Sequence, residues 1–212
     1  MRATVTPTSL PHKVIIHVVE DDPSVRSAIE RLLRIAGYKP YTYGSASELL
    51  IADLEDAPGC MLLDVHLPGV NGLDLHAALA RKPDALPVVF ITGRGDIEMG
   101  VRAIKAGAVD FLTKPVKREP LLSAIATAVA RNQDDRAKRA RREDLRVRYQ
   151  SLTERERHVF ERVVKGQLNK VVAHELGTSL RTVKSHRARV MAKLQASSIV
   201  DLARIAAELA SP

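Results

Sequence analysis

CMLLDVHLPGVNG, residues 60–72, is the stretch that decides the fold of the first part of this chain. An apolar run ends at a carboxylate, Asp64, and the chain then passes through Pro68 and Gly69. A short run that is apolar throughout fits a strand buried on both faces, as in a parallel sheet. Proline and glycine after it predict a turn that leads the chain away. The strand is therefore expected to hold Asp64 rigidly at its tip, with the carboxylate accessible.

The segments on both sides of this strand alternate between strand and helix patterns. Apolar runs predict further strands at 13–19, 40–43, 87–92 and 109–113, and amphipathic spacing predicts helices between them. Near-continuous apolar strands that alternate with amphipathic helices form a parallel sheet covered on both faces. The first half is therefore predicted to be a doubly wound α/β domain.

Polar residues gather at the carboxyl ends of the predicted strands, the edge at which such sheets bind ligands. Four strands end in acids, a hydroxyl or an amine, at Glu20–Asp21–Asp22, Asp64, Thr92 and Thr113–Lys114. Carboxylates that converge repel one another unless a cation joins them, and oxygen ligands suit Mg²⁺. A lysine and a threonine suit phosphoryl oxygens. Asp64 is thus predicted to be a nucleophile that accepts a phosphoryl group.

Each of these residues also has a plainer explanation. Asp22 before Pro23 fits a helix N-cap followed by proline in the first turn. A single acid at a strand end is often a turn residue, and Lys114 could be a solvated surface amine. The joint pattern at four strand ends favours the phosphoryl site. The sequence contains no GxxxxGK[ST] loop, which argues against nucleotide binding.

These motifs resemble those of a known family. Glu20–Asp21, Asp64 in LLDVHLPGVNG, Thr92 in FITGRGD and Lys114–Pro115 in AGAVDFLTKPV are similar to the receiver domain of two-component response regulators, over residues 13–131. The resemblance implies a flavodoxin-like, five-stranded sheet of order 2-1-3-4-5. It also implies that a sensor histidine kinase phosphorylates Asp64.

The same resemblance implies a metal site. Mg²⁺ (or Mn²⁺) would be held by Asp21, Asp64 and the backbone carbonyl of His66, with Glu20 assisting through water. Glu20 stands where many relatives have aspartate, a common variant that should not abolish metal binding. His66 is a less usual residue two positions past the acceptor, and its imidazole could alter the lifetime of the phosphoryl group.

The remaining receiver residues are implied to contact the phosphoryl group or to respond to it. Lys114 would contact the phosphoryl group, and the peptide bond between Lys114 and Pro115 would be cis. Thr92 would move toward the phosphoryl oxygens, and Phe111 would turn inward behind it, which is the switch of the family.

The net charge of +8 comes from the last third of the chain. Residues 1–130 contain 14 Lys and Arg against 15 Asp and Glu, whereas residues 131–212 contain 19 against 10. A basic part joined to a neutral one suggests a polyanionic partner, and we expect nucleic acid. Residues 132–149 are predicted to be a charged linker, either a solvated helix or a flexible segment, with a DNA-contacting arm as the alternative.

The basic part contains a helix-turn-helix pattern. The stretch LTERERHVFERVVKG predicts a helix that begins after Thr153 and ends at Gly166. A short helix in NKVVAHELG ends at Gly177, and a basic third helix begins in TSLRTVKSHRARVMAKL.

The third helix has an inner and an outer side. Val183, His186, Val190 and Leu194 share the inner side, where His186 is expected to be packed and hydrogen-bonded rather than to act as a ligand. The outer side is basic and suits the major groove. The base-edge candidates are Lys184 and Ser185, and the phosphate-contact candidates are Asn169, Lys170, Arg189 and Lys193. The complete predicted set of DNA contacts is Asn169, Lys170, Arg181, Thr182, Lys184, Ser185, Arg187, Ala188, Arg189 and Lys193.

This second part resembles the four-helix, all-α LuxR-type DNA-binding domain over residues 150–210, and the whole chain is similar to FixJ-type response regulators. The resemblance implies a homodimer on phosphorylation, double-stranded promoter DNA and RNA polymerase as partners. The last helix, 198–209, carries an apolar stripe of Ile199, Leu202, Ala206 and Leu209. The stripe fits either core packing or a dimer contact.

Together these features predict a phosphorylation-dependent transcriptional regulator, acting as an activator. It would be no enzyme, apart from self-phosphorylation from phosphodonors and slow autodephosphorylation at Asp64. One alternative is a DNA-binding regulator that works without phosphorylation. The other is an aspartyl-phosphate hydrolase, which would typically need Asp-x-Asp where this chain has Asp-Val-His.

Composition predicts a cytoplasmic protein with no membrane partner. Residues 1–12 contain no apolar signal segment, and nowhere do eighteen apolar residues follow one another. Cys60 is the only cysteine, so no disulfide is expected within the chain. The lack of tryptophan counts against a stacking platform for single-stranded nucleic acid.

Overall fold

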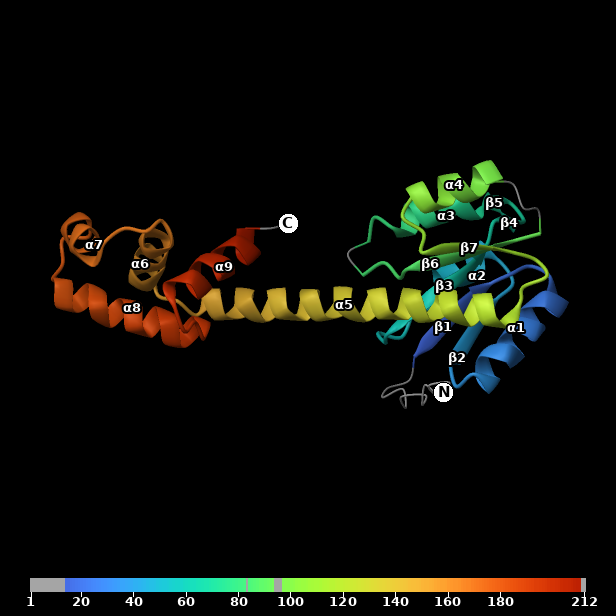
Figure 1. Cartoon of the computed structure of the whole chain (residues 1–212), viewed down its shortest axis with the longest axis horizontal. Coiled ribbons are helices and arrows are strands. Elements are labelled where there is room, and N and C mark those ends of the chain that lie inside the picture. Colours follow the sequence, from blue (N-terminus) through green and yellow to red (C-terminus); the bar gives the residue numbers. More distant parts are fainter. Residues whose placement is uncertain (1–13, 83, 94–96, 211–212) are drawn as a thin grey trace, which may run out of the picture. The chain divides into compact units, whose positions relative to one another are not determined.

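The chain forms two compact units, Met1–Arg136 and Ala137–Pro212 (Figure 1). The computed structural model describes residues 14–82, 84–93 and 97–210. The predicted start of the first domain at residue 13 and the segment 1–12 lie outside these residues.

A parallel five-stranded sheet is the centre of the first unit. Its strand order is β2-β1-β3-β6-β7, which is the predicted order 2-1-3-4-5 when strands are counted within this sheet. A short antiparallel hairpin, β4-β5, directly follows β3 and was not predicted. The strands are β1 (Ile15–Val19), β2 (Lys39–Tyr43), β3 (Gly59–Asp64), β4 (His66–Leu67), β5 (Val70–Asn71), β6 (Val88–Thr92) and β7 (Asp110–Thr113).

Helices cover both faces of the sheet (Figure 1). Side chains on alternate positions of each strand point to opposite faces, so the core has two layers. Ile16 and Leu62 pack with α1 and the first turns of α5, whereas Leu63 and Phe90 pack with α2, α3 and α4. The helices are α1 (Pro23–Ile35), α2 (Ala46–Ile51), α3 (Gly72–Leu79), α4 (Ile97–Lys105) and α5 (Arg118–Gln150).

Cys60 lies inside the first of these layers. Its side chain is fully buried in β3, and burial raises the pKa of the thiol to about 12. Because the thiolate is the reactive form, this cysteine is chemically inert in the folded protein.

Four helices form most of the second unit, as predicted. They are α6 (Glu154–Val164), α7 (Asn169–Glu175), α8 (Leu180–Leu194) and α9 (Ile199–Ala210). Leu202 and Ile205 of α9 are buried in the core, and Ala206 and Leu209 pack against it, while Ile199 is exposed. Most of the apolar stripe of α9 is therefore core packing.

The end of α5 also belongs to the second unit. Residues 132–149, predicted to be a charged linker that is either a solvated helix or a flexible segment, are helical and continue α5 without a break. Leu145 is buried in the core of the second unit, and the ring of Tyr149 packs edge-to-face on Phe160. Arg141 donates two hydrogen bonds to Glu208 of α9, at 2.8 and 3.1 Å. Within the described ranges, no helix is long and apolar enough to cross a membrane.

Candidate functional site

Strand pairing brings the predicted receiver residues to one edge of the sheet. Glu20 directly follows β1 and lies beside Asp64, the last residue of the neighbouring β3. On the other side of β3, strand β6 ends at Thr92, which pairs with Thr113 of β7. Lys114 is the next residue. All of these strands are parallel, so their carboxyl ends meet at the same edge.

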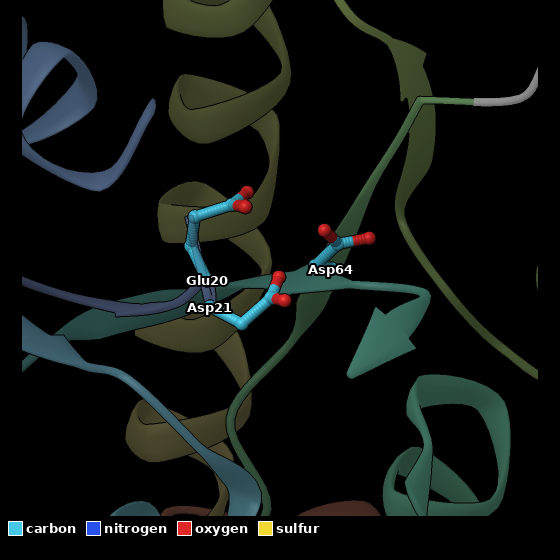
Figure 2. Close-up of side chains that lie close together, drawn as sticks. All are labelled: Glu20, Asp21 and Asp64. Carbon is cyan, nitrogen blue, oxygen red and sulfur yellow. The ribbon is translucent and has the colours of Figure 1, made fainter. Parts of the chain in front are cut away.

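Three carboxylates converge there. Glu20, Asp21 and Asp64 each offer an oxygen, and these oxygens lie within 4.8 Å of one another. Figure 2 shows their side chains projecting from the ends of β1 and β3 into one region. Glu20 is 1% exposed and Asp64 4%, whereas Asp21 is open to solvent.

Lys114 neutralises part of this negative charge. Its Nζ donates to Glu20 Oε1 and to Asp64 Oδ2, both at 2.7 Å. Burial alone would lower the pKa of the Lys114 ammonium, but the hydrogen bonds to Asp64 and Glu20 outweigh burial and raise it. The lysine is therefore a fixed positive charge beside Asp64.

The acid cluster fits a hard divalent cation. Burial raises the pKa of the Glu20 carboxyl above its ordinary value, since the charged form loses hydration. Glu20 Oε2 is buried and forms an ion pair with Lys114 Nζ at 2.7 Å, with no hydrogen bond to this oxygen among the described residues. Three carboxylates whose oxygens lie within 4.8 Å of one another suit Mg²⁺, which prefers oxygen ligands.

The loop after Asp64 is packed tightly against it. The amide of His66 donates to Asp64 Oδ1 at 2.9 Å, so each carboxylate oxygen of Asp64 already accepts a hydrogen bond. Gly72, the first residue of α3, approaches the Asp64 carbonyl so closely that a Cβ would lie 2.3 Å from its oxygen. Only glycine therefore fits at position 72.

The predicted switch residues surround the same edge. Thr92 is fully buried, and its Oγ1 lies 3.5 Å from His66 Nδ1, which is long for a hydrogen bond. Phe111 is half-buried, and its ring is so close to Gly100 that a Cβ there would lie 3.2 Å from it. The Lys114–Pro115 peptide is cis.

The structure adds Arg26, which the sequence did not single out. This residue of α1 donates from Nη1 to the carbonyl oxygens of both Glu20 and Asp21. No motif points to it, because it contacts backbone groups, which every residue offers.

The helix-turn-helix pattern also takes its predicted form. Gly177, with φ +59°, makes the turn between α7 and α8, and Ser179 caps α8 by accepting from the Thr182 amide at 3.1 Å. Val183 and Val190 are buried. The exposed predicted residues of α8 are Arg181, Lys184, Ser185, Ala188 and Arg189.

Four other predicted DNA contacts have partners within the unit. Thr182 Oγ1 lies 2.8 Å from the Ser179 hydroxyl, and Arg187 donates to Asn169 Oδ1 at 3.3 Å. Lys193 donates to Glu156 Oε2 at 2.6 Å and to the Ser151 carbonyl at 2.9 Å.

Two further residues of α7 and α8, Lys170 and His186, differ in exposure. Lys170 at the start of α7 is exposed. His186 is half-buried on the inner side of α8, and within the described part of the chain its Nδ1 has no hydrogen-bond partner.

Comparisons with known proteins match both units. The model of the response regulator receiver domain matches residues 16–126, and that of bacterial regulatory proteins of the luxR family matches residues 150–206. Nodulation protein W of Bradyrhizobium diazoefficiens is 43% identical over 93% of this chain and 87% of its own length. Transcriptional regulatory protein FixJ of Azorhizobium caulinodans is 36% identical over 93% of both chains. The solved structure of response regulator StyR is 40% identical, with a TM-score of 0.81, over 93% of this chain and 100% of that one.

Proposed function

Because the chain belongs to the response regulators that join a receiver domain to a LuxR-type DNA-binding domain, we propose that Asp64 is its phosphoryl acceptor. The observation that carries this proposal is the setting of the Asp64 carboxylate. It is almost buried at the tip of β3, with the Lys114 ammonium 2.7 Å away and two further acids beside it.

The phosphodonor is a phosphohistidine of a sensor histidine kinase. One carboxylate oxygen of Asp64 attacks phosphorus, the phosphorus–nitrogen bond breaks, and its electron pair stays on the imidazole of the kinase. Lys114, already at the carboxylate, then contacts a phosphoryl oxygen as a point charge. Mg²⁺, held by Asp21, Asp64 and the His66 carbonyl with Glu20 assisting through water, would offset the charge of the phosphoryl oxygens.

Phosphorylation is read out through Thr92 and Phe111. The Thr92 hydroxyl moves to a phosphoryl oxygen, and the half-buried Phe111 ring turns inward behind it. The receiver function is assigned to residues 13–131 and DNA binding to residues 150–210, with 132–149 as the connection. The receiver then dimerises in the cytoplasm.

A dimer presents two helix-turn-helix units to a promoter. Pairing of half-sites raises affinity because the second contact becomes intramolecular. The exposed Lys184 and Ser185 contact base edges, and Lys170 and Arg189 contact phosphates. Bound in this way, the regulator acts on RNA polymerase as an activator.

The test is an intact-mass spectrum of wild type and Asp64→Asn after incubation with acetyl phosphate and Mg²⁺, with light scattering on the same samples. We expect wild type to gain one phosphoryl group and to dimerise, and Asp64→Asn to do neither. If acetyl phosphate fails, beryllofluoride replaces it as a phosphoryl mimic. A wild type that stays unmodified, and monomeric with beryllofluoride, would instead be a regulator that works without phosphorylation.

A further inference from the structure

Two side chains attach the acid loop that follows β1, residues 20–22, to α1. The first is Asp22, whose side chain accepts from the amides of Ser24 and Val25 at 2.7 and 3.2 Å and so caps the helix. The second is Arg26, one turn into the helix. Its Nη1 donates to the Glu20 carbonyl at 2.5 Å and to the Asp21 carbonyl at 3.1 Å.

These two carbonyls belong to the residues whose carboxylates form the acid cluster. The amide of Glu20 donates to the carbonyl of Tyr43 on β2 at 3.1 Å, as in the sheet. The carbonyls of Glu20 and Asp21 instead accept from the Arg26 guanidinium. A peptide unit is planar, so a fixed carbonyl also fixes the torsion of the residue that carries it. Arg26 thereby helps to set the direction in which the Glu20 and Asp21 side chains leave the backbone.

Electrostatic repulsion acts on this loop, although Lys114 offsets part of it. Three carboxylates within 4.8 Å repel one another, and burial of Glu20 makes this repulsion costlier than in water. Without the Arg26 guanidinium, the loop could relax by turning Asp21, which is exposed, out toward solvent. A guanidinium resists this motion because its donors lie in a rigid plane and its charge persists at every relevant pH.

We propose that Arg26 is a positioning residue for the cation site. It holds the Glu20–Asp21 backbone so that the carboxylates are already arranged when Mg²⁺ arrives, and the ion does not have to order the loop. This inference rests on the proposed function, because it concerns the metal on which phosphorylation of Asp64 depends. Both hydrogen bonds of Arg26 go to backbone carbonyls, so it acts on the site by holding the backbone and not as a ligand.

The variants that test this role are made in the full-length chain. Arg26→Met removes both hydrogen bonds and the positive charge while keeping a long side chain. Arg26→Lys keeps a charged donor without the rigid plane. Arg34→Met is the matched control, because Arg34 lies on the same helix, is 65% exposed and pairs with Glu30 within that helix at 2.7 Å.

Two measurements are made on each variant. Calorimetric titration with Mg²⁺ alone gives the dissociation constant, and the initial rate of phosphorylation from acetyl phosphate is followed against Mg²⁺ concentration. Removal of groups that support metal ligands typically weakens binding about 10- to 100-fold, and we expect about 10-fold for Arg26→Met. Arg26→Lys should fall between it and wild type, and Arg34→Met should equal wild type.

The dependence on Mg²⁺ separates positioning from general damage. If Arg26 acts by arranging the ligands, saturating Mg²⁺ restores the phosphorylation rate of Arg26→Met close to that of wild type. A damaged domain would stay slow at every Mg²⁺ concentration. Far-ultraviolet circular dichroism checks folding, and if Arg26→Met is unfolded, Arg26→Gln replaces it in the same comparison.

The outcomes distinguish this inference from the function on which it rests. Wild-type affinity for Mg²⁺ in Arg26→Met, or in Arg26→Gln where that variant replaces it, overturns the positioning role and leaves the phosphoryl acceptor intact. Failure of Mg²⁺ to restore the rate also overturns it. Failure of wild type itself to bind Mg²⁺ or take up phosphate removes the proposed function, and this inference with it.

Discussion

Single lysines neutralise almost buried carboxylates in both units. Lys114 does so for Asp64 and Glu20, and this pairing could be expected from sequence because their strands are parallel and end at one edge. Lys193 does so for Glu156, which is 2% exposed. The sequence predicted that Lys193 contacts a DNA phosphate and did not predict its pairing with Glu156. A helical wheel shows on which side of a helix a residue lies, but not which distant residue it contacts.

His17 is a buried titratable residue away from the acid cluster. It lies in β1, is 2% exposed, and its Nδ1 is 3.0 Å from the Tyr43 hydroxyl, with its ring stacked near Tyr41 and Tyr43. Burial lowers the pKa of the imidazole from its ordinary 6.5 to about 4. The folded protein therefore keeps His17 neutral under conditions in which the unfolded chain protonates it.

This difference predicts a loss of stability in mild acid. Between pH 6.5 and pH 4 the unfolded state binds the proton more readily, so the free energy of unfolding falls as pH falls. Up to about 2 kcal/mol should be lost between pH 7.5 and pH 5 from this residue. Urea unfolding of wild type and His17→Asn at both pH values measures it, since asparagine does not titrate. An equal loss in both proteins would mean that His17 is not responsible.

Elements with a regular pattern were predicted well, the short hairpin was not predicted, and the charged segment 132–149 was predicted only as either a solvated helix or a flexible one. The three central strands of the parallel sheet, β1, β3 and β6, are apolar runs because both of their faces are buried. The hairpin β4-β5 has only two residues in each strand, too few for any periodicity. The second half of α5 is charged, and the partner of Arg141 in the second unit, Glu208, is distant in sequence.

The end of α5 should stabilise the second unit. Truncation of a buried leucine typically costs about 2–5 kcal/mol, so Leu145→Ala should lower the free energy of unfolding of this unit by that order. Val147→Ala is the control on the same helix, because Val147 is 58% exposed and should change stability by less than about 0.5 kcal/mol.

Fragments give a second measure of the same contribution. A fragment of residues 137–212 should unfold at a higher urea concentration than one of residues 150–212, which begins where the luxR-family match begins. Equal urea midpoints for the two fragments, together with an unchanged free energy of unfolding for Leu145→Ala, would show that the end of α5 does not stabilise the second unit.

At the scale of the whole molecule, charge separates the two parts of the chain. Residues 131–212 carry 19 basic against 10 acidic residues, whereas residues 1–130 are almost balanced. Phosphate contacts release counterions from DNA, so binding should weaken steeply as salt rises.

Two exposed lysines, Lys170 and Lys184, should respond differently to substitution. Lys170→Ala should weaken binding to every duplex alike and reduce the slope of log affinity against log salt by about 1. Lys184→Ala should instead reduce the preference for a selected duplex over a scrambled one, by about 1–3 kcal/mol. Fluorescence anisotropy of beryllofluoride-treated protein at several KCl concentrations measures both. If the two variants behave alike, the assignment of Lys170 to phosphates and of Lys184 to base edges is wrong.

The burial of Cys60 makes this chain a ready host for site-specific labelling. The only native thiol is fully buried, with its pKa raised to about 12, so maleimide reagents would leave it unmodified. A cysteine introduced at an exposed serine, such as Ser47 of α2 or Ser185 of α8, would then be the sole point of attachment for a dye or spin label. A pair of such probes would report the distance between the two units before and after phosphorylation, in the otherwise unaltered protein.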